Sequence, residues 1–220
     1  MVRLWIVASS VFVGSILVPK VDSLLERLER TSRLDEQLRL YREATLLAVT
    51  YQDDRSKSLL NEVQSLVEKT NTPLGRAVWG QLRAHHLRST GEEGGEDPLL
   101  LQREAAEQYL LAGDTTEAAV VLARTASQYR GLGDIPAYTT TMTLLVELGD
   151  RTSDLNAKAT ANLMEGSRLW YGGDPTAGRE RFERGLAAAR ATSERAASAP
   201  PIVPRITTAR GGRTNTFTTT

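Results

Sequence analysis

The sequence predicts an all-α fold, a solenoid of antiparallel helical hairpins followed by a disordered C-terminal tail. Three observations lead to this prediction. In the central part of the 220-residue chain, apolar side chains recur at helical spacing, short turn motifs separate the apolar stretches, and strand-like alternation is absent. Ala, Leu, Arg and Glu, which all favour helices, dominate the same part of the chain.

Composition divides the chain into three segments. Residues 1–19 combine an early basic residue, Arg3, with an apolar run, and residues 20–195 carry the helical pattern. Residues 196–220 are rich in Ala, Ser, Pro and Thr and contain no acidic residue. We expect this last segment to be disordered, because it has too few apolar side chains to bury.

Two interpretations of the apolar run at residues 4–18 stay open. Its length suits the core of a signal peptide, whereas a spanning helix usually needs roughly 18 or more apolar residues. Residues 1–19 then export the protein or tether it to a membrane, although Lys20 and Asp22 make a poor cleavage site. Alternatively, the run is an apolar edge helix or strand of a cytoplasmic protein.

Two apolar stripes predict the first helices of the central segment. The spacing within each stripe is three or four residues, with Leu66 and Val67 both counted from Val63, which places the members on one helix face. The first stripe consists of Leu34, Leu38, Tyr41, Thr45 and Ala48, and the second of Leu59, Val63, Leu66 and Val67.

Capping residues predict where the later helices begin. An oxygen-bearing side chain followed by proline starts a helix well, since proline at the first position loses no hydrogen bond. Such pairs are Thr72-Pro73, Asp97-Pro98 and Asp174-Pro175. Glycine can end one helix in the left-handed conformation while aspartate caps the next. The pairs of this kind are Gly113-Asp114, Gly133-Asp134, Gly149-Asp150 and Gly173-Asp174.

The turns at Gly113 and Gly173 have matching surroundings. A small residue stands seven positions before each turn and a large one four before, and a small residue follows at five and a large one at nine. The first set is Ala106, Tyr109, Ala118 and Leu122, and the second is Gly166, Leu169, Gly178 and Phe182. Ala126 and Tyr129 repeat the first two offsets before Gly133. We expect Ala106 and Gly166 to allow close helix approach, and Leu122 and Phe182 to fill the gap between hairpins.

This pattern resembles the tetratricopeptide repeat, most closely over residues 98–130 and 155–189. The sequence of the repeats is also similar to that of repeat arrays in bacterial signalling regulators. The tryptophan of the family's first helix is absent, with Gln102 and Asn162 in its place, and so is its closing proline. The resemblance implies a superhelix of about four hairpins with a concave face that holds a protein or peptide. The family takes that face from the first helix of each hairpin, which implies contacts from Gln102, Arg103, Gln108, Asn162, Glu165 and Arg168.

Catalytic and metal-binding patterns are weak. His85 and His86 are adjacent, so on a helix they point about 100° apart and do not converge on one metal; we expect one to be partly buried and one solvated. The acidic residues around Gly94-Gly95 are expected to form a solvated loop. The chain has no cysteine, which removes thiolate sites, and its 27 basic and 27 acidic residues balance. We therefore expect no enzyme activity, no cofactor, no metal and no nucleic-acid partner.

Two functions stay open at this point. The first is a protein-interaction adaptor or scaffold that presents a helical groove to a partner. The second is the regulatory arm of a bacterial signalling or transcription regulator, separated from its ATPase or DNA-binding module.

Overall fold

The computed structural model describes residues 20–92 and 95–198, and every regular element within them is an α-helix. Residues 20–29 are helical. Eight further helices follow in chain order: α2 (Leu34–Thr50), α3 (Ser56–Thr70), α4 (Pro73–Thr90), α5 (Pro98–Leu111), α6 (Thr115–Leu132), α7 (Ile135–Arg151), α8 (Leu155–Tyr171) and α9 (Pro175–Ser198). The all-α prediction is confirmed.

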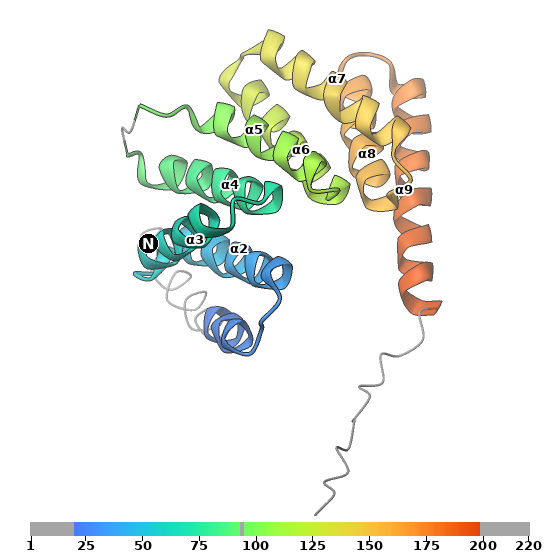
Figure 1. Cartoon of the computed structure of the whole chain (residues 1–220). Helices are drawn as coiled ribbons and strands as arrows, with labels where there is room; N and C mark the ends of the chain where they lie inside the picture. The colour runs from blue at the N-terminus through green and yellow to red at the C-terminus, as the bar shows by residue number, and fades with distance from the viewer. Residues whose placement is uncertain (1–19, 93–94, 199–220) are drawn as a thin grey trace, which may run out of the picture.

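Each helix from α2 to α9 packs against the next one in the chain, and the stack follows an arc (Figure 1). Contacts between helices two apart join α2 with α4 and α6 with α8. No comparable contact in the described ranges joins α4 with α6, α3 with α5, α5 with α7 or α7 with α9. Ion pairs nevertheless join Arg39 and Arg42 of α2 to Asp114 and Glu117 at the start of α6. The contacts between helices two apart thus all join even-numbered helices, which form the inner layer of the arc, while the odd-numbered helices form the outer layer.

The predicted helix starts at the three prolines are confirmed. Helices α4, α5 and α9 begin at Pro73, Pro98 and Pro175. The residue before each proline accepts a hydrogen bond from the first turn. Thr72 Oγ1 accepts from Gly75 N at 3.1 Å, Asp97 Oδ1 from Leu99 N at 2.8 Å, and Asp174 Oδ1 from Ala177 N at 3.0 Å. These bonds satisfy backbone donors that have no partner within the helix.

Three of the four predicted Gly-Asp turns are confirmed. Gly113, Gly133 and Gly173 have φ angles of 78°, 76° and 98°, in the left-handed region that glycine adopts without strain. The following aspartates cap the next helices: Asp114 Oδ1 accepts from Glu117 N, and Asp134 Oδ1 accepts from Ala137 N.

The fourth turn, at Gly149-Asp150, is wrong. Both residues lie inside α7, which continues to Arg151, and Asp154 caps α8 instead by accepting from Asn156 N and Ala157 N. Gly149 is glycine for a packing reason, since a Cβ atom there would collide with the Cβ of Ala161 in α8. The sequence alone does not distinguish a glycine that allows two helices to pack closely from a glycine that ends a helix.

The repeat positions lie in the core. Ala106, Tyr109, Ala118, Leu122 and Ala126 are all buried within one continuous apolar cluster. The cluster extends from Leu38 of α2 to Ala161 of α8. The stripe residues Leu38, Thr45, Ala48, Leu59 and Val63 are also buried, as their spacing predicts. The sequence pattern therefore identified the packing faces correctly.

Close packing of α8 on α9 depends on small residues. A Cβ atom at Gly166 would lie 2.9 Å from Phe182 Cδ1 and 3.0 Å from the Gly178 carbonyl oxygen. The predicted close approach at Gly166 is thus confirmed. The predicted place of Phe182 between hairpins is wrong: its ring packs within the α8–α9 pair, over Gly166 and 6.4 Å from the ring centre of Trp170.

Both predicted end segments extend beyond the described residues. Residues 1–19, predicted as a signal, anchor or edge helix, lie outside them. Helix α9 continues to Ser198, past the boundary expected at residue 195, and residues 199–220 of the predicted tail also lie outside the described part.

We expect Gly149→Ala to lower the free energy of unfolding by about 1–3 kcal/mol, because the added methyl group forces α7 away from Ala161. Urea unfolding followed by circular dichroism measures this effect. The matched control is Gly131→Ala in α6, where an added Cβ meets no atom within 4 Å. There the higher helix propensity of alanine should raise stability by about 0.5–1 kcal/mol. Equal effects of the two substitutions would contradict the packing role of Gly149.

Candidate protein-interaction surfaces

Three of the predicted contact residues lie on α5, in the outer layer. Gln102 is 2% exposed, and its Oε1 accepts a hydrogen bond from Thr125 Oγ1 at 2.9 Å. Gln108 Oε1 accepts from Arg76 Nε at 2.9 Å. Both glutamines therefore join α5 to its neighbours, while the partly exposed Arg103 borders a groove described below.

The other three predicted residues lie on α8, in the inner layer. Asn162 is 8% exposed and bridges α8 and α9, since its Oδ1 accepts from Arg181 Nη1 at 3.2 Å. Glu165 is also 8% exposed and accepts two hydrogen bonds from Arg168, at 2.6 and 2.7 Å. The Arg168 side chain is the most accessible of the three, at 43%.

The six residues do not form one concave surface, and the reason is the phase of the repeat. The two best-matching hairpins, α5–α6 and α8–α9, are separated by the single helix α7. Because one helix separates the two hairpins, their first helices lie in different layers: α5 in the outer layer and α8 in the inner layer. Short turns of the same Gly-Asp type join helices within and between hairpins. The spacing of the turns alone therefore does not show which helix is the first of each hairpin.

An apolar groove of about 250 Å³ lies between the outer helices α5 and α7. Its apolar lining consists of Ala106, Leu110, Leu122, Leu144 and Leu148, of which Leu110 and Leu144 are 41% and 42% exposed. The groove exists because α5 and α7 both pack on α6 but make no comparable contact with each other. We call it the α5–α7 groove.

Four charged residues border the α5–α7 groove: Arg103 and Glu107 from α5, and Glu147 and Arg151 from α7. None of the four has an ion-pair or hydrogen-bond partner among the side chains that the structure describes. Two guanidinium groups and two carboxylates thus surround an apolar floor without being used by the fold. Sequence analysis identified only Arg103, because the repeat pattern matches most closely over residues 98–130 and 155–189, and α7 lies between these two ranges.

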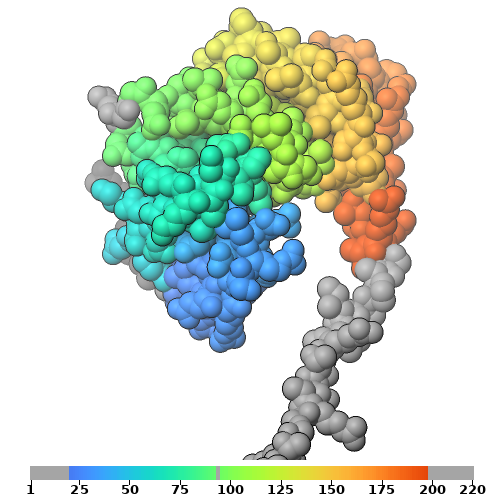
Figure 2. Space-filling view, viewed as in Figure 1, coloured from blue at the N-terminus to red at the C-terminus, as the bar shows by residue number. Residues whose placement is uncertain are grey.

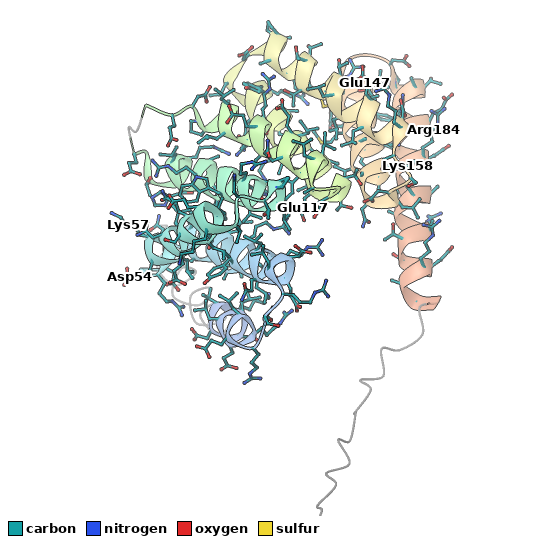
Figure 3. All side chains as sticks on the ribbon, in the orientation of Figure 1. Asp54, Lys57, Glu117, Glu147, Lys158 and Arg184 are labelled. Atoms are coloured by element: carbon teal, nitrogen blue, oxygen red, sulfur yellow. The ribbon has the colours of Figure 1, made fainter. Side chains whose placement is uncertain are left out.

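A second, smaller groove of about 220 Å³ lies on the other side of α7, against α8. It is lined by Met142, Val146, Glu147, Glu165 and Arg168, together with Thr139 and Thr143. This α7–α8 groove contains two of the predicted contact residues. Glu147, labelled in Figure 3, borders both grooves.

A cluster of ionic side chains occupies the inner layer where α2 meets the first turns of α6 and α8. Arg39 pairs with Asp114 at 3.6 Å, and Arg42 pairs with Glu117, which Figure 3 labels. Thr115 and Thr116 donate to Asp154 Oδ2 at 3.0 and 2.6 Å. These groups border a polar cavity of about 470 Å³. In contrast to the α5–α7 groove, its charged groups are paired with one another.

The surroundings of Asp154 shift its pKa. Partial burial raises the pKa of the carboxyl, but hydrogen bonds from Thr116, the Ala157 amide, Thr115 and the Asn156 amide outweigh burial and lower it overall. The ionised form is therefore favoured in the folded protein. Asp154 both caps α8 and fastens it to the start of α6.

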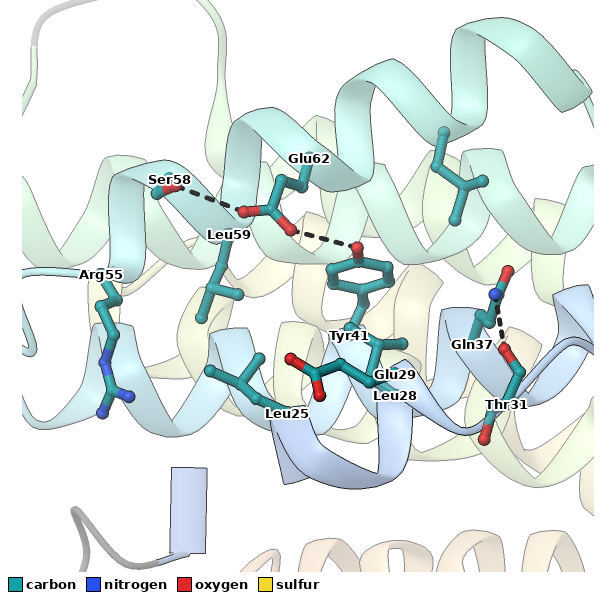
Figure 4. Close-up of a pocket in the computed structure, with 11 residues that line it drawn as sticks. Leu25, Leu28, Glu29, Thr31, Gln37, Tyr41, Arg55, Ser58, Leu59 and Glu62 are labelled. Carbon is teal, nitrogen blue, oxygen red and sulfur yellow. Dashed lines mark hydrogen bonds between the residues drawn. The ribbon is translucent and has the colours of Figure 1, made fainter. Parts of the chain in front are cut away.

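A pocket of about 580 Å³ lies at the N-terminal end of the stack between residues 20–29, α2 and α3 (Figure 4). Leu25, Leu28, Tyr41, Leu59 and Leu66 form its apolar lining. Tyr41 donates a hydrogen bond to Glu62 at 3.1 Å, and burial together with this carboxylate raises the pKa of Tyr41 to about 12.

The histidines point to different neighbours, as expected. His85 Nε2 lies 3.1 Å from Thr50 Oγ1 of α2, whereas His86 Nε2 lies 3.7 Å from Glu92 in the acidic loop. Both rings are half-buried, so the expected solvated histidine is wrong. Two acids of the loop, Glu92 and Glu96, pair with Arg83. Within residues 20–92 and 95–198, no group of three or more potential metal ligands is present.

The predicted membrane tether lies in residues 1–19, outside the described part. Among the helices that the structure does describe, none has the length and apolar character needed to cross a membrane.

Comparison with known proteins gives no relative for this chain. No protein-family model matches it, and neither the curated proteins nor the solved structures contain a match.

We expect Asp154→Ala to lower the free energy of unfolding by about 1–2 kcal/mol at pH 7, since it removes the α8 cap and the acceptor of two threonines. Because folding lowers the pKa of Asp154, its contribution is present above the ordinary value of 3.8 and is lost as the pH falls through the lower folded value. Urea unfolding of both proteins between pH 7 and pH 2 tests this. Asp54→Ala, at an exposed aspartate (Figure 3), is the control and should have little effect.

Proposed function

We propose that this chain is a non-enzymatic adaptor, built on a tetratricopeptide-like helical array, that binds an amphipathic helix of a partner protein. The observation that carries the proposal is the α5–α7 groove, where an apolar floor is surrounded by charged side chains without partners in the described part of the chain. The resemblance to tetratricopeptide repeats supports a binding role but, apart from Arg103, leads to different contact residues.

The shape of the groove suits a helix. Helices α5 and α7 flank α6 on one side and leave the position between them free. A partner helix laid along this position would restore the helix-to-helix packing that the inner layer has between α6 and α8. The volume of about 250 Å³ accommodates one or two large apolar side chains, since a cavity of about 150 Å³ already holds a benzene molecule.

The charges around the groove indicate the chemistry of the partner. Each wall carries one basic and one acidic residue four positions apart, Arg103 with Glu107 and Glu147 with Arg151. A partner helix with apolar anchors flanked by both basic and acidic side chains would pair with them. Charged groups at a rim contribute mainly to orientation and specificity, while the buried apolar anchors supply most of the affinity.

The ionisable groups with shifted pKa values support a non-enzymatic role. Asp154 lies in a paired cluster that joins helices, and Tyr109, whose pKa burial raises to about 12, donates a hydrogen bond to Gln81 at 2.7 Å. Each of these groups has a structural partner within the fold, and the hydrogen bonds that it makes join two helices.

The test is affinity capture of the full-length tagged protein from its own cells, followed by binding measurements with the recovered partner. We expect Leu110→Glu and Leu144→Glu each to weaken binding at least about tenfold, since each puts a charge on the groove floor. The matched control is Leu111→Glu, next to Leu110 on the same helix but 69% exposed and outside the groove.

Binding that responds equally to Leu110→Glu and Leu111→Glu would contradict the assignment to this groove. If Arg168→Ala weakened binding instead, the partner would occupy the α7–α8 groove. Circular dichroism of each variant shows whether the fold is retained.

A further inference from the structure

We propose that two copies of this chain associate through the outer face of α9, with the two helices antiparallel. The face consists of six exposed residues, Arg179, Glu183, Leu186, Ala187, Arg190 and Glu194, which we call the α9 stripe. Their spacing of three or four residues, with Leu186 and Ala187 together at the centre, places them on one side of the helix. The proposal does not depend on the α5–α7 groove or on its partner.

The α9 stripe lies on the side of α9 that faces away from the stack. Helix α9 packs on α8 through Gly178 and Gly185, and no other described helix packs against it comparably. With 24 residues against the 17 of α8, α9 is the longer helix, and its last turns extend beyond the rest of the described stack (Figure 2). Residues 193–197 in these turns are all exposed. Helix ends without tertiary contacts are only marginally stable in water, so contact with a second copy would stabilise this end.

The charges of the α9 stripe are complementary to the same charges in reverse order. Counted from the centre of the stripe, Glu183 lies as far in one direction as Arg190 lies in the other. Arg179 and Glu194 are related in the same way, farther out. In an antiparallel pair with a two-fold axis at this centre, each acidic residue of one copy faces a basic residue of the other. A parallel pair would instead place like charges side by side.

The four charged residues of the α9 stripe are also the ones that the fold leaves unused. None of them has an ion pair or a side-chain hydrogen bond within residues 20–92 and 95–198. The other charged residues of α9 all have interactions: Arg181 pairs with Asp150 at 3.1 Å, Glu180 with Arg184 at 3.9 Å, and Arg195 is also engaged. The unpaired charges of α9 are therefore the four that a second copy would pair.

The centre of the α9 stripe is apolar. Leu186 is 49% exposed, and the two-fold axis would bring the Leu186 side chains of the two copies together. Ala187 beside it is small enough to let the two helices approach closely. An apolar centre surrounded by charged residues is typical of protein interfaces. Because only one helix of each copy takes part, the interface is small, and we expect a reversible dimer that salt weakens by screening the exposed ion pairs.

Exchange of charges across the two-fold axis tests the proposal. Sedimentation equilibrium of the purified full-length protein should show monomer and dimer in equilibrium. We expect Glu183→Arg and Arg190→Glu each to weaken association at least about tenfold, since each substitution creates two contacts between like charges. The double variant Glu183→Arg/Arg190→Glu restores opposite charges and should restore association. The control is Arg184→Glu, which lies outside the α9 stripe and should leave association unchanged.

The absence of cysteine allows a separate test of the register. Under mild oxidation, Leu186→Cys should form a disulfide between copies, because the axis brings the two positions within the few ångströms that the bond requires. Ser193→Cys, at an exposed position of the same helix, should not. Antiparallel pairing about this centre separates the two copies of Ser193 by about 20 Å along the helix.

Three results would overturn the proposal. The first is a protein that stays monomeric up to millimolar concentration. The second is a dimer that tolerates both single charge reversals, and the third is failure of the double variant to recover the association that the single variants lose. Circular dichroism shows whether each variant retains the fold, and the disulfide test does not require a change of charge.

Discussion

Short turns between consecutive helices are the constraint on which this structure depends. After a turn of a few residues, such as Ala112 to Asp114, the next helix runs back antiparallel to the previous one and packs against it. Each helix therefore buries one face against its predecessor and another against its successor. The arc, the two layers and the grooves between outer helices all follow, because helices on the inside of an arc approach one another and those on the outside separate.

Small residues and paired polar side chains determine how closely the helices approach. Gly149 and Gly166 let backbones come together where a larger residue would separate them. Buried polar groups then fix the alignment: Tyr109 donates to Gln81 across α5 and α4, and Thr125 donates to Gln102 across α6 and α5. An unpaired buried polar group is costly, so these bonds disfavour a helix that slides along its neighbour by one turn.

Much of the fold could be predicted from the sequence because helix ends and packing faces are local properties. Pro73, Pro98 and the aspartates at 114, 134 and 174 act on the first turn of their own helices. The failures concern properties that depend on distant residues. The role of Gly149 is set by Ala161, and the burial of Gln102 by Thr125. The α5–α7 groove depends on which helices share a layer, which no single repeat unit encodes.

The position of Glu147 has a consequence for any ligand of the two grooves beside α7. Glu147 lies on α7 and lines both the α5–α7 groove and the α7–α8 groove. One side chain adopts one rotamer at a time, so a ligand that engages this carboxylate from one side withdraws it from the other. Two ligands that both needed the Glu147 carboxylate, one in each groove, would therefore compete for it across α7.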